Sequence, residues 1–65
     1  MENIIEIERK KKKLTQEDLA KRCNVTRQTI NAIENNKYDP SLSLAFKLAQ
    51  LLERTVDELF FPNID

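Results

Sequence analysis

Apolar residues recur along this chain at the three- and four-residue spacing of amphipathic helices, in segments separated by short polar stretches. The pattern predicts an all-α chain with five helices. Their expected spans are about residues 4–12, 15–23, 26–35, 42–53 and a short segment between Thr55 and Pro62. The fourth span has the clearest apolar stripe, formed by Ala45, Leu48, Ala49 and Leu52.

The first span has the least regular pattern, because Ile5-Glu6-Ile7-Glu8 also alternates as a strand would. We place Ile4 and Ile7 on the inner side of this helix, with Ile5 near them. The alternatives are that the helix is rotated about its axis or that its first turn is irregular.

Capping residues mark where several helices begin. Thr15 followed by Asp18, and Thr55 followed by Glu58, have the spacing of a capping box, while Thr26 is a single N-cap. Ser41 or Ser43 caps the fourth helix. The chain contains no glycine, so Asn24 and Asn36 are expected to supply the positive φ that turns after helices require.

The helix over residues 26–35 has two chemically different faces. At 100° per residue, Ile30 and Ile33 point inward. The opposite arc presents arginine, carboxamide and small side chains and no carboxylate, namely Arg27, Gln28, Asn31, Ala32 and Asn35. Arginine pairs with guanine, and asparagine or glutamine with adenine, in the major groove. The helix over residues 26–35, attached by its apolar face and preceded by a short helix and a tight turn, indicates a helix-turn-helix that reads DNA. The alternative is an ordinary polar helix face.

Length and composition exclude several classes of protein. Sixty-five residues predict a single domain over residues 1–65, with marginal stability. One cysteine and no histidine exclude an internal disulfide and a zinc site, so no metal or cofactor is expected and self-association remains the way to add stability. No segment resembles a membrane span, a signal peptide or an enzyme active site. We therefore expect a soluble cytoplasmic protein without membrane contact.

Charge is unevenly distributed although the net charge is zero. Residues 9–37 carry nine Lys or Arg against three acids, which gives +6, whereas residues 38–65 carry −3. Such a dipolar chain can turn a positive face to phosphates. The alternative is that the run of lysines from Lys10 to Lys13 only solvates a helix end.

Taken together, four segments resemble the phage repressor and Cro-like helix-turn-helix family, in particular its short stand-alone members. They are Leu14–Ala20, Val25–Ile30, Ile33–Tyr38 and Asp39–Leu42. The resemblance spans essentially the whole chain and implies a five-helix repressor-like bundle that binds double-stranded DNA as a homodimer.

The resemblance also implies roles for individual residues. Base edges would be read by Arg27, Gln28, Thr29 and Asn31. Phosphates would be bound by Gln16, Thr26, Asn35 and Lys37, although capping alone explains Thr26 and Lys37 is equally a solvated charge. A structural ion pair would join Arg9 to Glu34. Lys13 stands where the family often has glycine, and Glu8 where it has an apolar residue.

The C-terminal segment carries more apolar surface than a small core needs. We expect a dimer interface formed by Leu59, Phe60, Phe61 and Ile64. The alternative for Phe61 is that it covers the core of its own chain. Residues 2–5 and 60–64 are also candidates for a small terminal β pairing. Cys23 is expected to be a buried small apolar residue, with a redox switch as the alternative.

The function that follows is sequence-specific DNA binding by a transcriptional regulator, expected to be a repressor, that reads an inverted repeat through the helix over residues 26–35. An antitoxin that also binds its own operator is the alternative. A protein-interaction module that has lost DNA binding is a third hypothesis, which the intact polar arc disfavours. A protein co-regulator remains open as a further partner.

Overall fold

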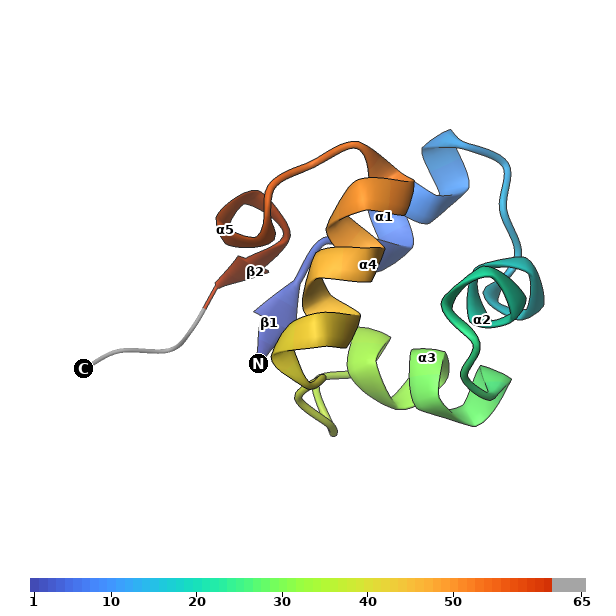
Figure 1. Ribbon diagram of the computed structural model, residues 1–65, viewed down its shortest axis with the longest axis horizontal. Coiled ribbons are helices and arrows are strands. Elements are labelled where there is room, and N and C mark those ends of the chain that lie inside the picture. Colours follow the sequence, from blue (N-terminus) through green and yellow to red (C-terminus); the bar gives the residue numbers. More distant parts are fainter. Residues whose placement is uncertain (62–65) are drawn as a thin grey trace.

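Five helices and one small sheet make up residues 1–61, the part of the chain that the computed structural model describes (Figure 1). In chain order the elements are β1 (Glu2–Asn3), α1 (Ile5–Lys11), α2 (Gln16–Cys23), α3 (Arg27–Glu34), α4 (Leu42–Leu52), α5 (Val56–Leu59) and β2 (Phe60–Phe61). The predicted five-helix, repressor-like arrangement is confirmed. Over residues 1–61, every helix is too short or too polar to span a bilayer.

Side-chain caps begin four of the five helices. Thr15 Oγ1 accepts the Asp18 N–H at 3.0 Å, and the Asp18 carboxylate accepts the Thr15 N–H at 2.9 Å, which completes the predicted capping box. Thr55 and Glu58 form a second box, and Thr26 caps α3. Ser41, of the two serines considered, caps α4. Local sequence therefore determines where these helices start.

Four residues with positive φ turn the chain after helices. Asn24 (58°) and Asn36 (61°) do so as predicted. Lys13 (59°) and Glu53 (57°) adopt the same left-handed conformation although their side chains have no special tolerance for it. The turn that joins α2 to α3 is thus made by asparagine where glycine is the usual solution.

The core lies where α1, α2, α3 and α5 meet around α4. Its largest side chains, all below 2% exposed, are Ile5, Leu19, Ile30, Ile33, Leu48, Leu52 and Leu59. The predicted α4 stripe is buried throughout its length. Cys23, at 2% exposed, joins this core, and burial raises the pKa of its thiol. The thiol therefore stays protonated at neutral pH and packs as a small apolar group.

The rotation of α1 differs from our prediction. Ile7, which we placed on the inner side, is 56% exposed, whereas Glu8 is 5% exposed, so the helix is rotated about its axis relative to that placement. The Glu8 carboxylate accepts hydrogen bonds from Arg54 Nε and Lys11 Nζ, both at 3.0 Å. The hydrogen bond from Arg54 is the main cause that lowers the pKa of Glu8. Two cationic partners on one carboxylate make this position tolerable for an acid.

The two ends of the described chain pair as an antiparallel sheet, in the register Glu2 with Phe61 and Asn3 with Phe60. Successive strand residues face opposite sides, so Phe60 turns inward and Phe61 turns outward. Phe60 is 5% exposed and Leu59 is 0% exposed. Our assignment of Leu59 and Phe60 to a dimer interface is therefore corrected, because both belong to the core of their own chain. Phe61 is 43% exposed, and Ile64 lies outside the described residues.

Candidate DNA-binding surface

The outer face of α3 presents exposed polar side chains. Ile30 and Ile33, each 1% exposed, attach the helix to the core, and α2 packs against it across the turn. Arg27 and Gln28 are exposed, and within residues 1–61 neither side chain makes a hydrogen bond. A guanidinium and a carboxamide are thus held outward on a rigid element, as base reading requires.

Thr29 is separated from the other three residues that the resemblance assigned to base reading. Its side chain is half-buried, and its Oγ1 lies 3.0 Å from Thr26 Oγ1. It lines a hollow between α3 and α4 rather than the outward arc. Asn31 does lie on the arc, and it is exposed beside Arg27 and Gln28.

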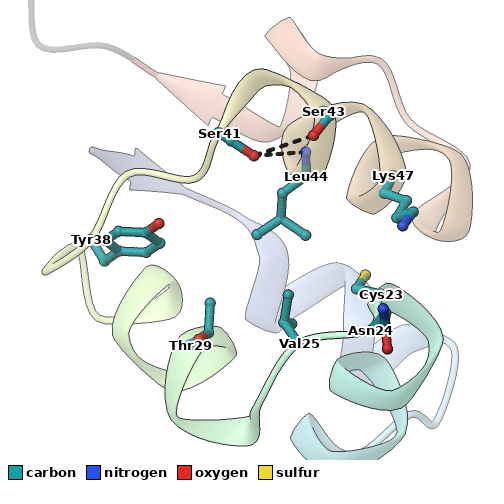
Figure 2. A pocket seen from close by; sticks show the side chains of 9 residues that line it. All are labelled: Cys23, Asn24, Val25, Thr29, Tyr38, Ser41, Ser43, Leu44 and Lys47. Carbon is teal, nitrogen blue, oxygen red and sulfur yellow. Dashed lines mark hydrogen bonds between the residues drawn. The ribbon is translucent and has the colours of Figure 1, made fainter.

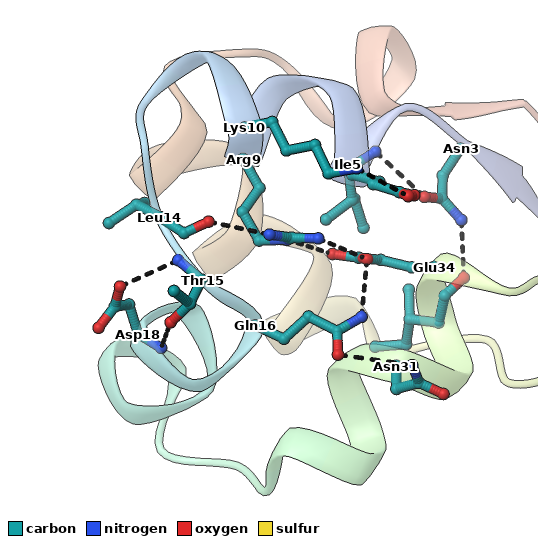
Figure 3. A network of polar contacts seen from close by, with 12 residues as sticks. Asn3, Ile5, Arg9, Lys10, Leu14, Thr15, Gln16, Asp18, Asn31 and Glu34 are labelled. Atoms are coloured by element: carbon teal, nitrogen blue, oxygen red, sulfur yellow. Dashed lines mark hydrogen bonds and ion pairs between the residues drawn. The ribbon is translucent and has the colours of Figure 1, made fainter.

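A network of polar contacts connects this arc with the protein interior (Figure 3). Arg9 forms the implied ion pair with Glu34 through two contacts, Nε to Oε2 at 2.7 Å and Nη2 to Oε1 at 3.1 Å. The two side chains are only 9% and 3% exposed. Arg9 Nη1 also donates to the Leu14 carbonyl at 2.9 Å, which fixes the loop before α2. The hydrogen bond to Glu34 is the main cause that raises the pKa of Arg9, so the guanidinium is permanently charged.

A basic hollow of about 400 Å³ flanks the arc at the N-terminal end of α2. Its lining carries four basic side chains and one acid, Glu17, beside Gln16; the basic residues are Arg9, Lys10, Lys13 and Arg27. Three lysines of the run also form ion pairs within the chain, since Lys10 lies 3.6 Å from Glu6, Lys11 pairs with Glu8, and Lys12 pairs with Glu53 at 2.7 Å. Lys10 and Lys13 are the two members of the run that line the hollow.

A second hollow, of about 340 Å³, flanks the arc on the side of α4 (Figure 2). Its hydrogen-bonding side chains include Asn24, Thr29 and four residues to which the sequence analysis gave no role in binding, namely Tyr38, Ser41, Ser43 and Lys47. Figure 2 shows Ser41 and Ser43 at the start of α4 and Lys47 one turn further along. The spacing of Ser43 and Lys47 by four residues was the sequence signal that could have indicated a shared helix face.

The four residues assigned to phosphates occupy different surroundings. Thr26 is exposed at the cap of α3, and Asn35 and Lys37 are exposed where the chain leaves that helix. Gln16 is half-buried, because its carboxamide lies between Glu34 and Asn31. The arc is therefore bordered by hydrogen-bond donors at both of its sides and at the end of α3.

Comparison with known proteins agrees with this geometry. A sequence model of the helix-turn-helix family matches residues 5–59. The chain is 52% identical to an uncharacterised HTH-type transcriptional regulator of Methanocaldococcus jannaschii, over 100% of this chain and 98% of the relative. A similar regulator of Methanothermobacter thermautotrophicus is 46% identical, over 100% and 96% of the two chains.

Two solved structures share the fold. The hypothetical transcription factor NHTF from Neisseria superposes with a TM-score of 0.78 at 29% identity, covering 91% of this chain and 68% of that one. The SinR protein/SinI protein complex gives a TM-score of 0.74 at 28% identity, covering 82% and 52%. The relatives are named as regulators rather than enzymes. With the family model spanning α1 to α5, the chain belongs to the helix-turn-helix family of transcriptional regulators.

Proposed function

We propose that the protein represses transcription by binding an inverted-repeat operator as a homodimer, with α3 in the major groove of each half-site. The observation that carries the proposal is the pair Arg27 and Gln28, exposed and without hydrogen-bond partners in residues 1–61. These are side chains that pair with guanine and adenine edges through two hydrogen bonds each.

Phosphate binding would come from the two borders of the arc. On the side of α2, Lys10 and Lys13 supply charge beside Gln16, at the positive end of the helix. On the side of α4, Ser41, Ser43 and Lys47 supply donors to the other strand. Thr26, Asn35 and Lys37 are proposed to complete the set. We expect about six to eight phosphate contacts per complex. A plot of the logarithm of the association constant against the logarithm of the salt concentration should then have a slope of roughly −5 to −7.

A second copy of the chain is proposed to pack against α4 and α5. Leu42 (69%) and Phe46 (54%) are exposed on α4, one turn apart. Each borders a mostly apolar hollow, of about 240 and 460 Å³, and Val56 lines both. We call Leu42, Phe46 and Val56 the α4–α5 surface; it leaves the reading arc free. A two-fold axis there would bring two α3 helices onto one side of DNA, at about 34 Å.

A protein co-regulator is a second proposal for how the chain is controlled. What supports it is that the SinR neighbour was solved in a complex with the SinI protein.

Selection of bound DNA from a random pool, followed by sequencing, tests the proposal. The expected product is a palindrome with half-sites about one helical turn apart. Gln28→Ala should then lose its preference for one base pair in each half-site. The free-energy difference between the selected base pair and the others at that position should fall by about 1–3 kcal/mol. Ile7→Ala, at an exposed site on α1 outside both the arc and the α4–α5 surface, is the control and should leave the selected sequence unchanged. A pool without any enriched sequence would refute the proposal.

A further inference from the structure

The Glu34 carboxylate sets the direction of every hydrogen bond that leads from the core to the reading arc. An ionised carboxylate only accepts hydrogen bonds, whereas a carboxamide has one accepting and one donating end. Both oxygens of the Glu34 carboxylate accept hydrogen bonds from the Arg9 guanidinium, Oε2 at 2.7 Å and Oε1 at 3.1 Å. Any group that approaches its Oε1 from the side of α2 must therefore donate.

Gln16 is that group, and its orientation follows. Gln16 Nε2 donates to Glu34 Oε1 at 3.0 Å, so Gln16 Oε1 points away from the carboxylate. This oxygen accepts a hydrogen bond from Asn31 Nδ2 at 3.4 Å. A reversed Gln16 would place one oxygen against another, which makes the opposite arrangement unfavourable.

The same logic extends one residue further. Because Asn31 Nδ2 faces Gln16, Asn31 Oδ1 faces the other way, and Asn35 Nδ2 donates to it at 3.2 Å. Asn35 Nδ2 is itself positioned by the Asn31 backbone carbonyl at 2.9 Å. Figure 3 shows the sequence of contacts from Arg9 through Glu34 and Gln16 to Asn31.

We propose that the buried Arg9–Glu34 pair fixes, through Gln16, which end of the Asn31 carboxamide is turned toward each side of the arc. Gln16 is then a positioning residue for base reading, in addition to its role toward phosphate. This inference rests on the proposed function, since it concerns how Asn31 reads a base.

The consequence is an oriented contact. Asn31 keeps one N–H and part of Oδ1 free, which is enough for the paired contact that asparagine makes with adenine. Adenine N7 would lie toward α2, where the amide nitrogen is, and its N6 amino group would lie toward Asn35. An Asn31 free to rotate would accept either arrangement and discriminate less.

The free protein gives the first test, through the side-chain amide signals of Asn31 in ¹⁵N-edited NMR spectra. In the wild type, one Asn31 Hδ2 proton should be shifted downfield by its bond to Gln16. Gln16→Ala and Gln16→Lys should both remove this shift, because neither side chain can accept a hydrogen bond. Ile7→Ala, the control on the exposed side of α1, should leave it unchanged. An Asn31 signal that is the same in all four proteins would overturn the inference.

Binding to the selected operator gives the second test. Asn31→Ala first identifies the base pair that Asn31 reads. Gln16→Lys still donates to Glu34 and attracts phosphate, so its salt slope should equal the wild-type slope or be steeper by about one. Its discrimination at the base pair read by Asn31 should nevertheless fall by about 3- to 10-fold, the effect of one lost hydrogen bond.

The outcomes separate the two proposals. If Gln28→Ala relaxes its own base pair while Gln16→Lys keeps full discrimination at the position of Asn31, the positioning role is refuted and the proposed function stands. If Asn31→Ala alters no base preference, the inference is likewise refuted. If the wild type selects no sequence at all, the proposed function fails, whatever the amide signals show.

Discussion

Replacing Glu34 with glutamine removes the negative partner of a guanidinium that is only 9% exposed. The glutamine keeps the size of the side chain, but it leaves Arg9 as a charge buried among neutral groups. Breaking a buried pair in this way destabilises proteins by about 3–5 kcal/mol. A 65-residue chain is expected to have a total stability of roughly 3–10 kcal/mol, so the variant should lose a large fraction of it.

Urea denaturation followed by circular dichroism at 222 nm measures this loss. Glu6→Gln is the matched control, because Glu6 contacts Lys10 at 3.6 Å on an exposed helix face. Its effect should be within about 0.5 kcal/mol. The double variant Arg9→Met/Glu34→Leu removes both charges and should recover most of the stability lost in Glu34→Gln. A loss below about 1 kcal/mol in Glu34→Gln would refute our account of a buried, mutually dependent pair.

Three further predictions concern other parts of the chain. Lys13→Gly should raise the free energy of unfolding by about 0.5–1 kcal/mol, since glycine relieves the positive φ of 59°; Lys13→Ala, which keeps the strain, should not. Phe46→Glu should shift sedimentation from dimer to monomer, whereas Ile7→Glu, at a similarly exposed apolar site outside the α4–α5 surface, should leave the dimer intact. Because the pKa of Glu8 is lowered in the folded protein, its contribution to stability is complete above the ordinary value of 4.5 and is lost as pH falls below it. In thermal unfolding, Glu8→Gln should therefore show a smaller decline of Tm under acid than the wild type, and an equal decline would contradict this account.

Several features could be predicted because they depend on residues close together in the sequence. The capping boxes at Thr15 and Thr55 involve partners three residues away, and the turns at Asn24 and Asn36 depend on one residue's backbone preference. The outward arc of α3 follows from helical periodicity once Ile30 and Ile33 are taken as the inner face.

Other features depend on partners that are distant in the sequence. Glu8 faces the protein because Arg54, 46 residues away, supplies a hydrogen bond to its carboxylate. Phe60 turns inward because β2 pairs with β1 at the other end of the chain. Asn3 also escaped prediction, because its amide donates to the carbonyl of Ile33, 30 residues away, at 2.8 Å. No local pattern contains these partners.

The sequence by itself therefore determined where the helices start, which turns need a tolerant residue and which side chains α3 turns outward, since each rests on interactions within one turn of the chain. Only the tertiary structure decided the rotation of α1, the inward position of Leu59 and Phe60, and the placement of Thr29 beside α4. It alone also brought Gln16 between Glu34 and Asn31, 18 and 15 residues away. The physical reason is that burial and hydrogen-bond direction are properties of neighbours in space, and packing selects those neighbours from elements far apart in the chain.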